Sequence, residues 1–140
     1  MDSVNAISLY EFARKAREFS YSPYSGYSVG AALLCSDGEI YTGCNIENAA
    51  YGPTNCAERT AFFKAVYDGH RDFTAIAVCG GKDGVITGPF PPCGVCRQVM
   101  REFCTDDFRI YMVGVGDSYE ERTLPQLLPD SFDPKKHMQG

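Results

Sequence analysis

Residues 73–79 read Phe73-Thr74-Ala75-Ile76-Ala77-Val78-Cys79, an apolar run interrupted by one threonine. A run of this length without regular polar alternation is typical of a strand that is buried on both faces of a sheet. Such a strand needs a layer of other elements on each side of it. The run therefore predicts an α/β protein in which helices cover both faces of a central sheet.

The segments on either side of this run predict alternating helices and strands. Leu9, Phe12, Ala13, Ala16 and Phe19 share one helical stripe and indicate a first helix. The further expected elements are strands 27–35 and 39–46 with a turn at 36–38, a helix 56–67 that stops at 68–69, the strand 73–79, a loop 80–92, a helix 93–104, a strand 108–115 and a helical turn 124–128. The last eight residues are expected to form a tail. The order αββαβαβ favours an α/β sandwich with a single domain over residues 1–140.

Composition and charge narrow the classes of partner. The 140 residues are 44% hydrophobic and 22% charged, as in ordinary globular domains. The net charge of -5 and the pI of about 4.9 disfavour a nucleic-acid partner, because an acidic chain repels phosphate. The first residues lack a basic region followed by an apolar run, and Ala31–Cys35 is too short to span a bilayer. We therefore expect no membrane partner and a cytoplasmic protein.

Three of the seven cysteines lie at the predicted starts of two helices. Cys93 and Cys96 are three residues apart, on one face of a helical turn, and Cys56 opens the other helix. Thiolates at helix N-termini are stabilised by the macrodipole and the free N–H groups, and they suit Zn²⁺. Three protein ligands leave tetrahedral zinc one open position, as in catalytic sites. A redox dithiol or a pair of buried cysteines would also explain the Cys-x-x-Cys spacing.

The other four cysteines and the two histidines have no obvious ligand spacing. Cys35 and Cys79 lie in apolar strand segments, where we expect small buried side chains. A rival interpretation is a closed structural zinc module that takes its fourth ligand from Cys35, Cys44, Cys79 or Cys104. We expect His70 and His137 at the surface and not among the metal ligands.

Glu58 follows Cys56 by two residues and has two candidate roles. Beside a metal ion, its carboxylate could move protons. If Asn55 were the N-cap of the helix, Glu58 would be its third residue and could instead close a capping box. The spacing alone does not separate the two roles.

Cys56-Ala57-Glu58, followed at a distance by Pro92-Cys93-Gly94-Val95-Cys96, resembles the signature of the zinc-dependent cytidine deaminases. The resemblance runs from about residue 9 to residue 132 and is to the small, three-cysteine, homotetrameric class. It also rests on segments 29–34, 43–51, 56–64, 96–99 and 127–129. It implies a three-layer α/β/α sandwich around a mixed sheet of about five strands, with one Zn²⁺ per chain bound by the three cysteines.

The resemblance also implies an activity, the hydrolytic deamination of cytidine and deoxycytidine to uridine and deoxyuridine plus ammonia, in pyrimidine salvage. In such enzymes a zinc-bound hydroxide attacks C4 of the base, and the residue at the position of Glu58 shuttles the protons. The position of Arg59 donates hydrogen bonds to the cysteine sulfurs. These roles predict that the chain binds a free nucleoside, with Glu58 as the catalytic residue.

Seven substrate-binding positions follow from the same resemblance. Asn45 and Glu47 match a pair that binds the ribose hydroxyls, and alternation along a strand would bring both side chains to one face. Ala57 matches a backbone N–H that meets the base carbonyl O2. Tyr27 stands where the family usually has Phe against the base, so its hydroxyl is a departure that needs a partner. The positions expected to reach a neighbouring subunit's pocket, in a homotetramer with shared sites, are Ala49, Tyr51 and Phe132.

Other deaminases are the nearest alternatives. An enzyme that edits polynucleotides would need a basic groove and long loops to hold a flipped base, whereas this chain is acidic and short. A related aminohydrolase, such as a blasticidin-type deaminase, stays open as an alternative on the same scaffold. The sequence does not rank cytidine against deoxycytidine.

Overall fold

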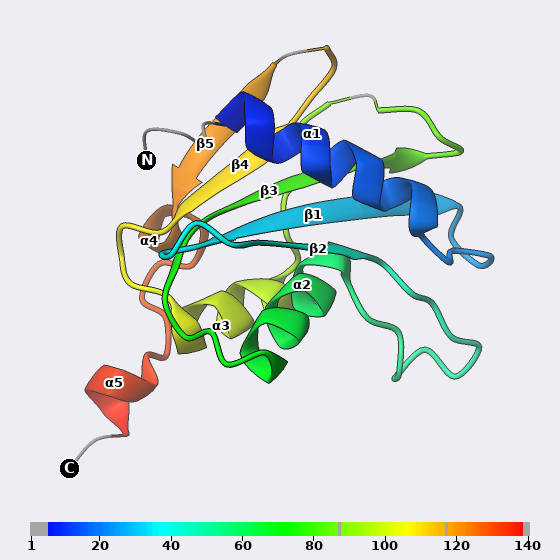
Figure 1. The fold of residues 1–140 in the computed structure, drawn as a ribbon. Coiled ribbons are helices and arrows are strands. Elements are labelled where there is room, and N and C mark those ends of the chain that lie inside the picture. The colour runs from blue at the N-terminus through cyan, green and yellow to red at the C-terminus, as the bar shows by residue number, and fades with distance from the viewer. Residues whose placement is uncertain (1–5, 87, 117, 139–140) are drawn as a thin grey trace.

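The computed structural model of the chain describes residues 6–86, 88–116 and 118–138. Its centre is a five-stranded sheet with the order β2-β1-β3-β4-β5 (Figure 1). The strands are β1 (Tyr27–Cys35), β2 (Ile40–Cys44), β3 (Phe73–Lys82), β4 (Arg109–Val113) and β5 (Tyr119–Thr123). β3 and β4 are parallel, and the other neighbouring pairs are antiparallel. The expected mixed sheet of about five strands is confirmed.

Helices cover both faces of this sheet. α1 (Ala6–Ala16) lies on one face, and α2 (Ala57–Tyr67) and α3 (Gly94–Phe103) lie on the other (Figure 1). The shorter helices are a 3₁₀ turn (Arg17–Phe19), α4 (Leu124–Leu127) and α5 (Pro134–His137). None of the helices in the described ranges is long and apolar enough to cross a membrane. The predicted α/β/α sandwich is therefore confirmed.

The central strand β3 is buried on both sides, as the run 73–79 predicts. Ile76 and Val78 join the core that includes α2 and α3, whereas Ala75 and Ala77 join the core under α1. All four are fully buried. Burial of a side chain as large as Ile76 or Val78 stabilises the fold by roughly 1.5–3 kcal/mol. β3 thus connects the two hydrophobic layers and carries the helices on both.

Close backbone contact places the start of α2 on the sheet. A Cβ atom on Gly43 of β2 would lie 2.4 Å from the Ala57 carbonyl oxygen and 2.6 Å from the Ala61 nitrogen. Any side chain at this position would force the helix away from the strand. Gly43 therefore sets the distance between α2 and the sheet, and with it the position of Cys56 directly before the helix.

Some element boundaries differ from the sequence-based expectation. β3 continues to Lys82, because Gly80 and Gly81 still pair with β1 although they were expected in the loop 80–92. β5 was not predicted, because this mostly exposed edge strand contains three charged residues and no apolar alternation. Part of the expected tail, Pro134–His137, forms α5.

The first helix also differs from its predicted stripe. Leu9, Ala13 and Ala16 are buried as expected, but Phe12 is 47% exposed and Phe19 is 75% exposed. α1 ends at Ala16, and the tighter 3₁₀ turn that follows changes the direction of the side chains. Phe19 therefore leaves the predicted stripe, and Phe12, within α1 itself, is only partly covered by the described chain.

Among the cysteines and histidines outside the motifs, the burial of one residue differs from the prediction. Cys35 and Cys79 are buried, as predicted, and His137 is exposed on α5. His70 was expected at the surface, yet its side chain is only 21% exposed. Its ring packs edge-on against Tyr41, with 5.2 Å between ring centroids. The turn after α2 holds this imidazole against the β1–β2 hairpin, which local sequence does not reveal.

Candidate active site

Two helices on the same face of the sheet begin at cysteines. Cys56 is the N-cap of α2 and Cys93 is the N-cap of α3, while Cys96 is buried in the first turn of α3. The Sγ atoms of Cys56 and Cys93 are 3.7 Å apart, and all three sulfurs lie within 4.8 Å of one another. The structure thus brings together the three cysteines that the sequence selects.

The spacing of these sulfurs fits a tetrahedral zinc ion. Zn–S bonds of about 2.3 Å place two sulfurs about 3.8 Å apart on a tetrahedron, close to the separation of 3.7 Å between Cys56 and Cys93. Among the described residues, no fourth cysteine, histidine or carboxylate joins the group. The described part of the chain therefore gives no support to a closed four-ligand module. Three ligands leave a coordination position for a small molecule.

Hydrogen bonds and helix ends favour a thiolate at Cys56. The Cys96 thiol and the Arg59 guanidinium both donate to its sulfur, and Arg59 Nη2 lies 3.3 Å away. These bonds lower the pKa of Cys56 to about 5, although burial opposes the shift. Donation to Cys56 in turn raises the pKa of Cys96. One thiolate is thus present at neutral pH, and a bound cation would stabilise the others.

Glu58 lies beside this group, where it interacts with Cys56 and Cys96, and it is only 3% exposed. Burial disfavours its charged form and raises its pKa to about 7. The capping-box interpretation is wrong, because Cys56 is the N-cap and no side chain caps this helix end. Asn55, the cap that this interpretation required, instead donates from Nδ2 to Thr60 Oγ1 at 3.0 Å. Glu58 is therefore a buried acid beside the sulfurs and does not close a capping box with Asn55.

Asn45 follows the end of β2 and is held by the chain itself. Its Oδ1 accepts hydrogen bonds from the Val29 backbone N–H at 2.9 Å and from Ser20 Oγ at 2.6 Å. Its Nδ2 donates to the Tyr27 carbonyl oxygen at 2.8 Å. Asn45 thereby connects the start of β1 to the segment after α1, and one of its amide hydrogens is left over.

Glu47 is fixed in a similar way by the turn before β1. Its Oε1 accepts from the backbone N–H groups of Tyr24 at 3.0 Å and Ser25 at 3.1 Å, and its Oε2 accepts from the Ser25 hydroxyl. The hydrogen bonds from Ser25 lower the pKa of Glu47. Sequence reasoning missed Ser20 and Ser25 as supports. The one available signal was the turn chemistry of residues 22–26, which places hydroxyl groups where they can bind loop side chains.

Tyr27 and Ala57 lie at the starts of β1 and α2. The Tyr27 side chain is 43% exposed, with the Phe90 ring centroid 6.3 Å from its own and Lys82 Nζ 5.9 Å from it. Ala57 is fully buried as the first residue of α2, where the backbone N–H has no partner within the helix. The structure thus offers an aromatic face at the start of β1 and a free N–H at the start of α2.

The loop after β2 leaves its tip exposed. Tyr51 is 74% exposed and adopts a φ of 64°, and Ala49 is exposed beside it. A pocket of about 380 Å³ lies at the base of this loop. Its lining residues are Tyr24, Ser25, Glu47, Asn48, Tyr51 and Thr54. The pocket therefore places the Glu47 carboxylate next to exposed aromatic surface.

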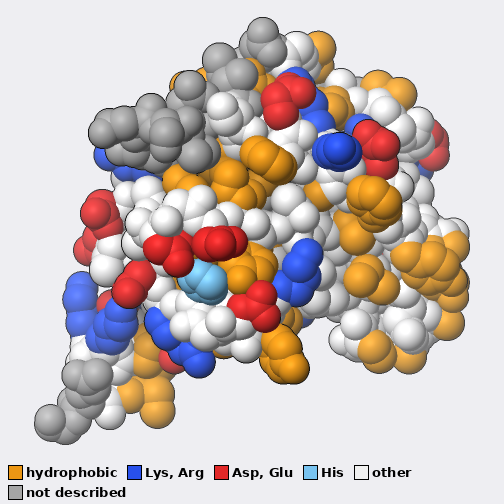
Figure 2. All heavy atoms as spheres, viewed as in Figure 1, with side chains coloured by type: hydrophobic (Ala, Val, Ile, Leu, Met, Phe, Trp, Pro, Cys, Tyr) orange, Lys and Arg blue, Asp and Glu red, His pale blue; other side chains and the backbone are white. Residues whose placement is uncertain are grey.

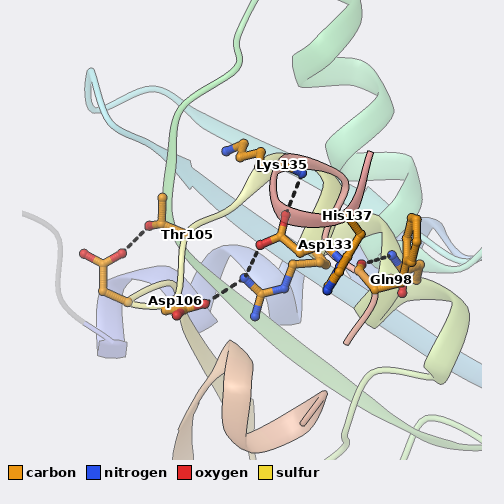
Figure 3. A network of polar contacts seen from close by, with 9 residues as sticks. Gln98, Thr105, Asp106, Asp133, Lys135 and His137 are labelled. Atoms are coloured by element: carbon orange, nitrogen blue, oxygen red, sulfur yellow. Dashed lines mark hydrogen bonds and ion pairs between the residues drawn. The ribbon is translucent and has the colours of Figure 1, made fainter. Parts of the chain in front are cut away.

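The C-terminal segment positions Phe132. Gln98 Nε2 of α3 donates to the Phe132 carbonyl oxygen at 3.0 Å, and the ring stacks on His137 at 5.4 Å. The ring itself is 53% exposed. Figure 3 shows the surrounding network, in which Asp133 lies beneath α5 and accepts from the Lys135 N–H at 2.9 Å. α3, which carries two of the cysteines, thus also fixes the segment with Phe132.

A buried arginine anchors this segment further. Arg101 is 4% exposed and its Nη1 lies 2.8 Å from Asp106 Oδ1 and 3.9 Å from Asp133 Oδ2. A second arginine, Arg97, binds the carbonyl oxygens of Pro92 at 2.8 Å and Leu127 at 2.7 Å. Arg97 therefore holds the chain directly before Cys93.

Comparisons with known proteins agree with this geometry. A family model described as the cytidine and deoxycytidylate deaminase zinc-binding region matches residues 4–112. A cytidine deaminase of Sporosarcina psychrophila is 55% identical over 120 residues, which cover 86% of this chain and 85% of the relative. The crystal structure of a cytidine deaminase from Burkholderia pseudomallei has a TM-score of 0.85 and 44% identity, with 92% of this chain and all of that chain covered. The crystal structure of a cytidine deaminase from Mycobacterium tuberculosis has a TM-score of 0.79 and 38% identity, with 92% of this chain and 98% of that chain covered.

We predict that the three-cysteine group binds one zinc ion per chain and that Cys93→Ala abolishes its retention. Loss of one thiolate removes a direct metal bond, so metal analysis after dialysis should show zinc near zero in this variant. Cys104→Ala is the matched control, because this buried cysteine belongs to no ligand group among the described residues. Zinc retained in full by Cys93→Ala, or absent from the freshly purified wild type, would contradict the assignment.

Proposed function

The chain belongs to the cytidine and deoxycytidylate deaminase family, and on this premise we propose that it deaminates free cytidine and deoxycytidine by hydrolysis, giving uridine or deoxyuridine and ammonia. The observation that carries the proposal is a buried carboxyl group, Glu58, beside three cysteine sulfurs with the spacing for zinc. This chemistry belongs to pyrimidine salvage, and we place the enzyme in the cytoplasm.

The residues divide the hydrolysis between them. Cys56, Cys93 and Cys96 would hold the zinc ion, which when bound supplies a Lewis acid that activates water. Glu58 takes a proton from the attacking water and gives it to N3 of the base. It then takes the remaining proton of that water, from the hydroxyl now on C4, and gives it to the amine, so that the C4–N bond breaks, ammonia leaves and the C4 carbonyl forms. A pKa raised by burial suits a group that must both accept and donate a proton near neutral pH.

Separate groups of residues recognise the base and the sugar of the nucleoside. We assign the base to the Tyr27 ring and to the Ala57 N–H, which meets the carbonyl O2. The ribose hydroxyls are assigned to Asn45 and Glu47, whose side chains are already held in place by hydrogen bonds within the chain. Preorganised polar groups lower the entropy that binding must overcome. A formal charge of -5 supports a free nucleoside over a nucleic acid as substrate.

Exposed apolar side chains support an assembly with shared sites. Large hydrophobic side chains that are 47% or more exposed lie around the 3₁₀ turn, the turn before β1 and the loop after β2, namely Phe19, Tyr21, Tyr24, Ile46 and Tyr51. Figure 2 shows hydrophobic side chains gathered at this end of the molecule, at the right of the view. Surfaces of this kind mark protein–protein contacts. We infer a homotetramer in which Ala49, Tyr51 and Phe132 complete a neighbour's pocket.

Arg59 adjusts the charge of the centre. Three thiolates exceed the charge of Zn²⁺ by one, which makes the metal a poor Lewis acid. The guanidinium of Arg59 lies 3.3 Å from the Cys56 sulfur and withdraws part of this charge. A unit charge about 4 Å from a thiolate gains about 4 kcal/mol at an effective dielectric of about 20, before desolvation is subtracted. The free N–H groups at the starts of α2 and α3 act in the same direction.

We predict that purified wild-type protein deaminates cytidine and deoxycytidine but not adenosine, cytosine or blasticidin S, as followed by ultraviolet absorbance. Glu58→Gln should fold and keep zinc, but it should lose about 10²–10⁴-fold in turnover because proton transfer is removed. Glu102→Gln, an exposed change on α3, is the matched control and should be fully active. Near-normal turnover in Glu58→Gln would rule out the proton-transfer role, and selective turnover of blasticidin S would favour the related aminohydrolase.

We predict that Arg59→Gln keeps the fold, weakens zinc retention and moves the acid limb of the pH–rate profile to higher pH. The sign follows from charge, because removal of a cation makes neighbouring acidic groups harder to deprotonate. The measurements are metal analysis during dialysis against a chelator and kcat as a function of pH. Arg122→Gln on β5 serves as the control for loss of one positive charge. If profile and zinc retention stay unchanged, the helix ends alone stabilise the thiolates.

We predict that a mixture of two inactive variants, Glu58→Gln and Phe132→Ala, recovers activity after subunit exchange. A chain with intact Glu58 would then receive Phe132 from its neighbour. Activity of the mixture is compared with that of each variant alone, and light scattering gives the oligomeric state. A fully active monomer at the assay concentration would disprove the shared site.

A further inference from the structure

A second group of metal-binding side chains lies at the other end of α2. Cys35 ends β1, Asp37 lies in the turn before β2, and His70 follows α2; together we call them the hairpin-end cluster. One ligand atom from each residue lies within 4.8 Å of the other two. Because α2 has 11 residues and is thus about 16 Å long, this cluster is separate from the three-cysteine group.

The donor atoms suit a borderline divalent cation. Thiolate, imidazole and carboxylate are all ligands of Zn²⁺. His70 Nε2 and Asp37 Oδ2 are 3.1 Å apart, close to the separation of about 3.3 Å that two zinc bonds of about 2.0–2.1 Å require at a tetrahedral angle. The nitrogen and the oxygen are therefore almost in place for a shared cation.

Negative charge surrounds the hairpin-end cluster. Asp37 and Glu39 both lie close enough to the Cys35 thiol for their negative charges to act on it. Asp68 adds a further carboxylate, which accepts a hydrogen bond from the Tyr41 hydroxyl at 2.8 Å. An excess of carboxylates at one point attracts a cation.

The imidazole of His70 is held firmly but is incompletely satisfied. The Tyr41 ring packs against it, and its Nε2 faces Asp37. Its Nδ1 is buried and has no hydrogen-bond partner among the described residues. The Asp37 side chain, by contrast, is 58% exposed, so the cluster opens to solvent on that side.

We propose that the hairpin-end cluster is a second divalent-cation site, in which Cys35, Asp37 and His70 bind one ion of the zinc type and water takes the fourth position. On binding, the Cys35 thiol releases its proton to solvent, and the sulfur bonds to the cation. The bound ion would link the β1–β2 hairpin to the connection between α2 and β3. This site does not depend on the deaminase chemistry, since it shares no residue with the three-cysteine group.

Cobalt titration of the zinc enzyme tests this proposal. The protein is first brought to one zinc per chain at the three-cysteine group, and Co²⁺ is then added. We expect about one further ion per chain, together with the near-ultraviolet absorption of a cobalt–thiolate bond. Cys35→Ala should lose this absorption and still keep its zinc. Cys104→Ala, which removes another buried thiol, should behave as the wild type.

If Cys35→Ala fails to fold, Asp37→Asn tests the proposed cation site instead. Asp37 is exposed, and an amide oxygen can still accept the hydrogen bond that Oδ1 takes from the Glu39 N–H at 3.0 Å. This variant should keep its melting temperature in chelator but bind Co²⁺ at least about tenfold more weakly. The proposal is overturned if the wild type takes up no second ion, if Cys35→Ala keeps the thiolate absorption, or if Asp37→Asn binds cobalt as well as the wild type. In those cases Asp37 and His70 form a plain hydrogen-bonded pair beside a buried thiol.

Discussion

Two helix N-termini must meet at one point over the sheet, and most of the structure depends on this constraint. Cys56 and Cys93 are both N-caps, so their sulfurs come within 3.7 Å only if α2 and α3 start side by side. Gly43 lets α2 approach β2 through bare backbone, and Arg97 fixes the chain before α3. In the sequence, α3 connects β3 to β4. Because these two strands are parallel, the connection must cross back over one face of the sheet, and this sets the path of α3. A sheet with this topology is what keeps three sulfurs from distant sequence positions together.

The same arrangement solves an electrostatic problem. Three thiolates repel one another, and burial of their charge is costly unless it is compensated. Two helix starts supply free N–H groups, Arg59 supplies a full positive charge, and the zinc ion that the family binds supplies two more. Glu58 adds no further negative charge while it is protonated, which burial favours. The balance of charge at the site and the proposed proton transfer therefore both depend on the burial of this one carboxyl group.

A feature of the fold or of the site could be predicted from the sequence only where residues close together in the chain carry the pattern for it. Cys56, Cys93 and Cys96 could be selected from sequence because helix starts and i, i+3 spacing are local patterns. The run 73–79 likewise carries its double burial in its own composition. β5 could not be found, because an exposed edge strand with charged residues lacks an apolar pattern. The contacts of His70 with Asp37 and of Asn45 with Ser20 also escaped prediction, since they join segments that only the tertiary fold brings together.

The internal bonds of Asn45 and Glu47 define what the proposed sugar site can accept. An amide offers two hydrogens and two lone pairs, and Asn45 uses both lone pairs and one hydrogen within the chain. A carboxylate offers about four lone-pair sites, and Glu47 uses three of them. One donor and one acceptor therefore remain on neighbouring residues, and both are fixed before any ligand arrives. A sugar hydroxyl group can accept from the amide or donate to the carboxylate, whereas a hydrogen or a methyl group in its place would leave the group that it faces unpaired.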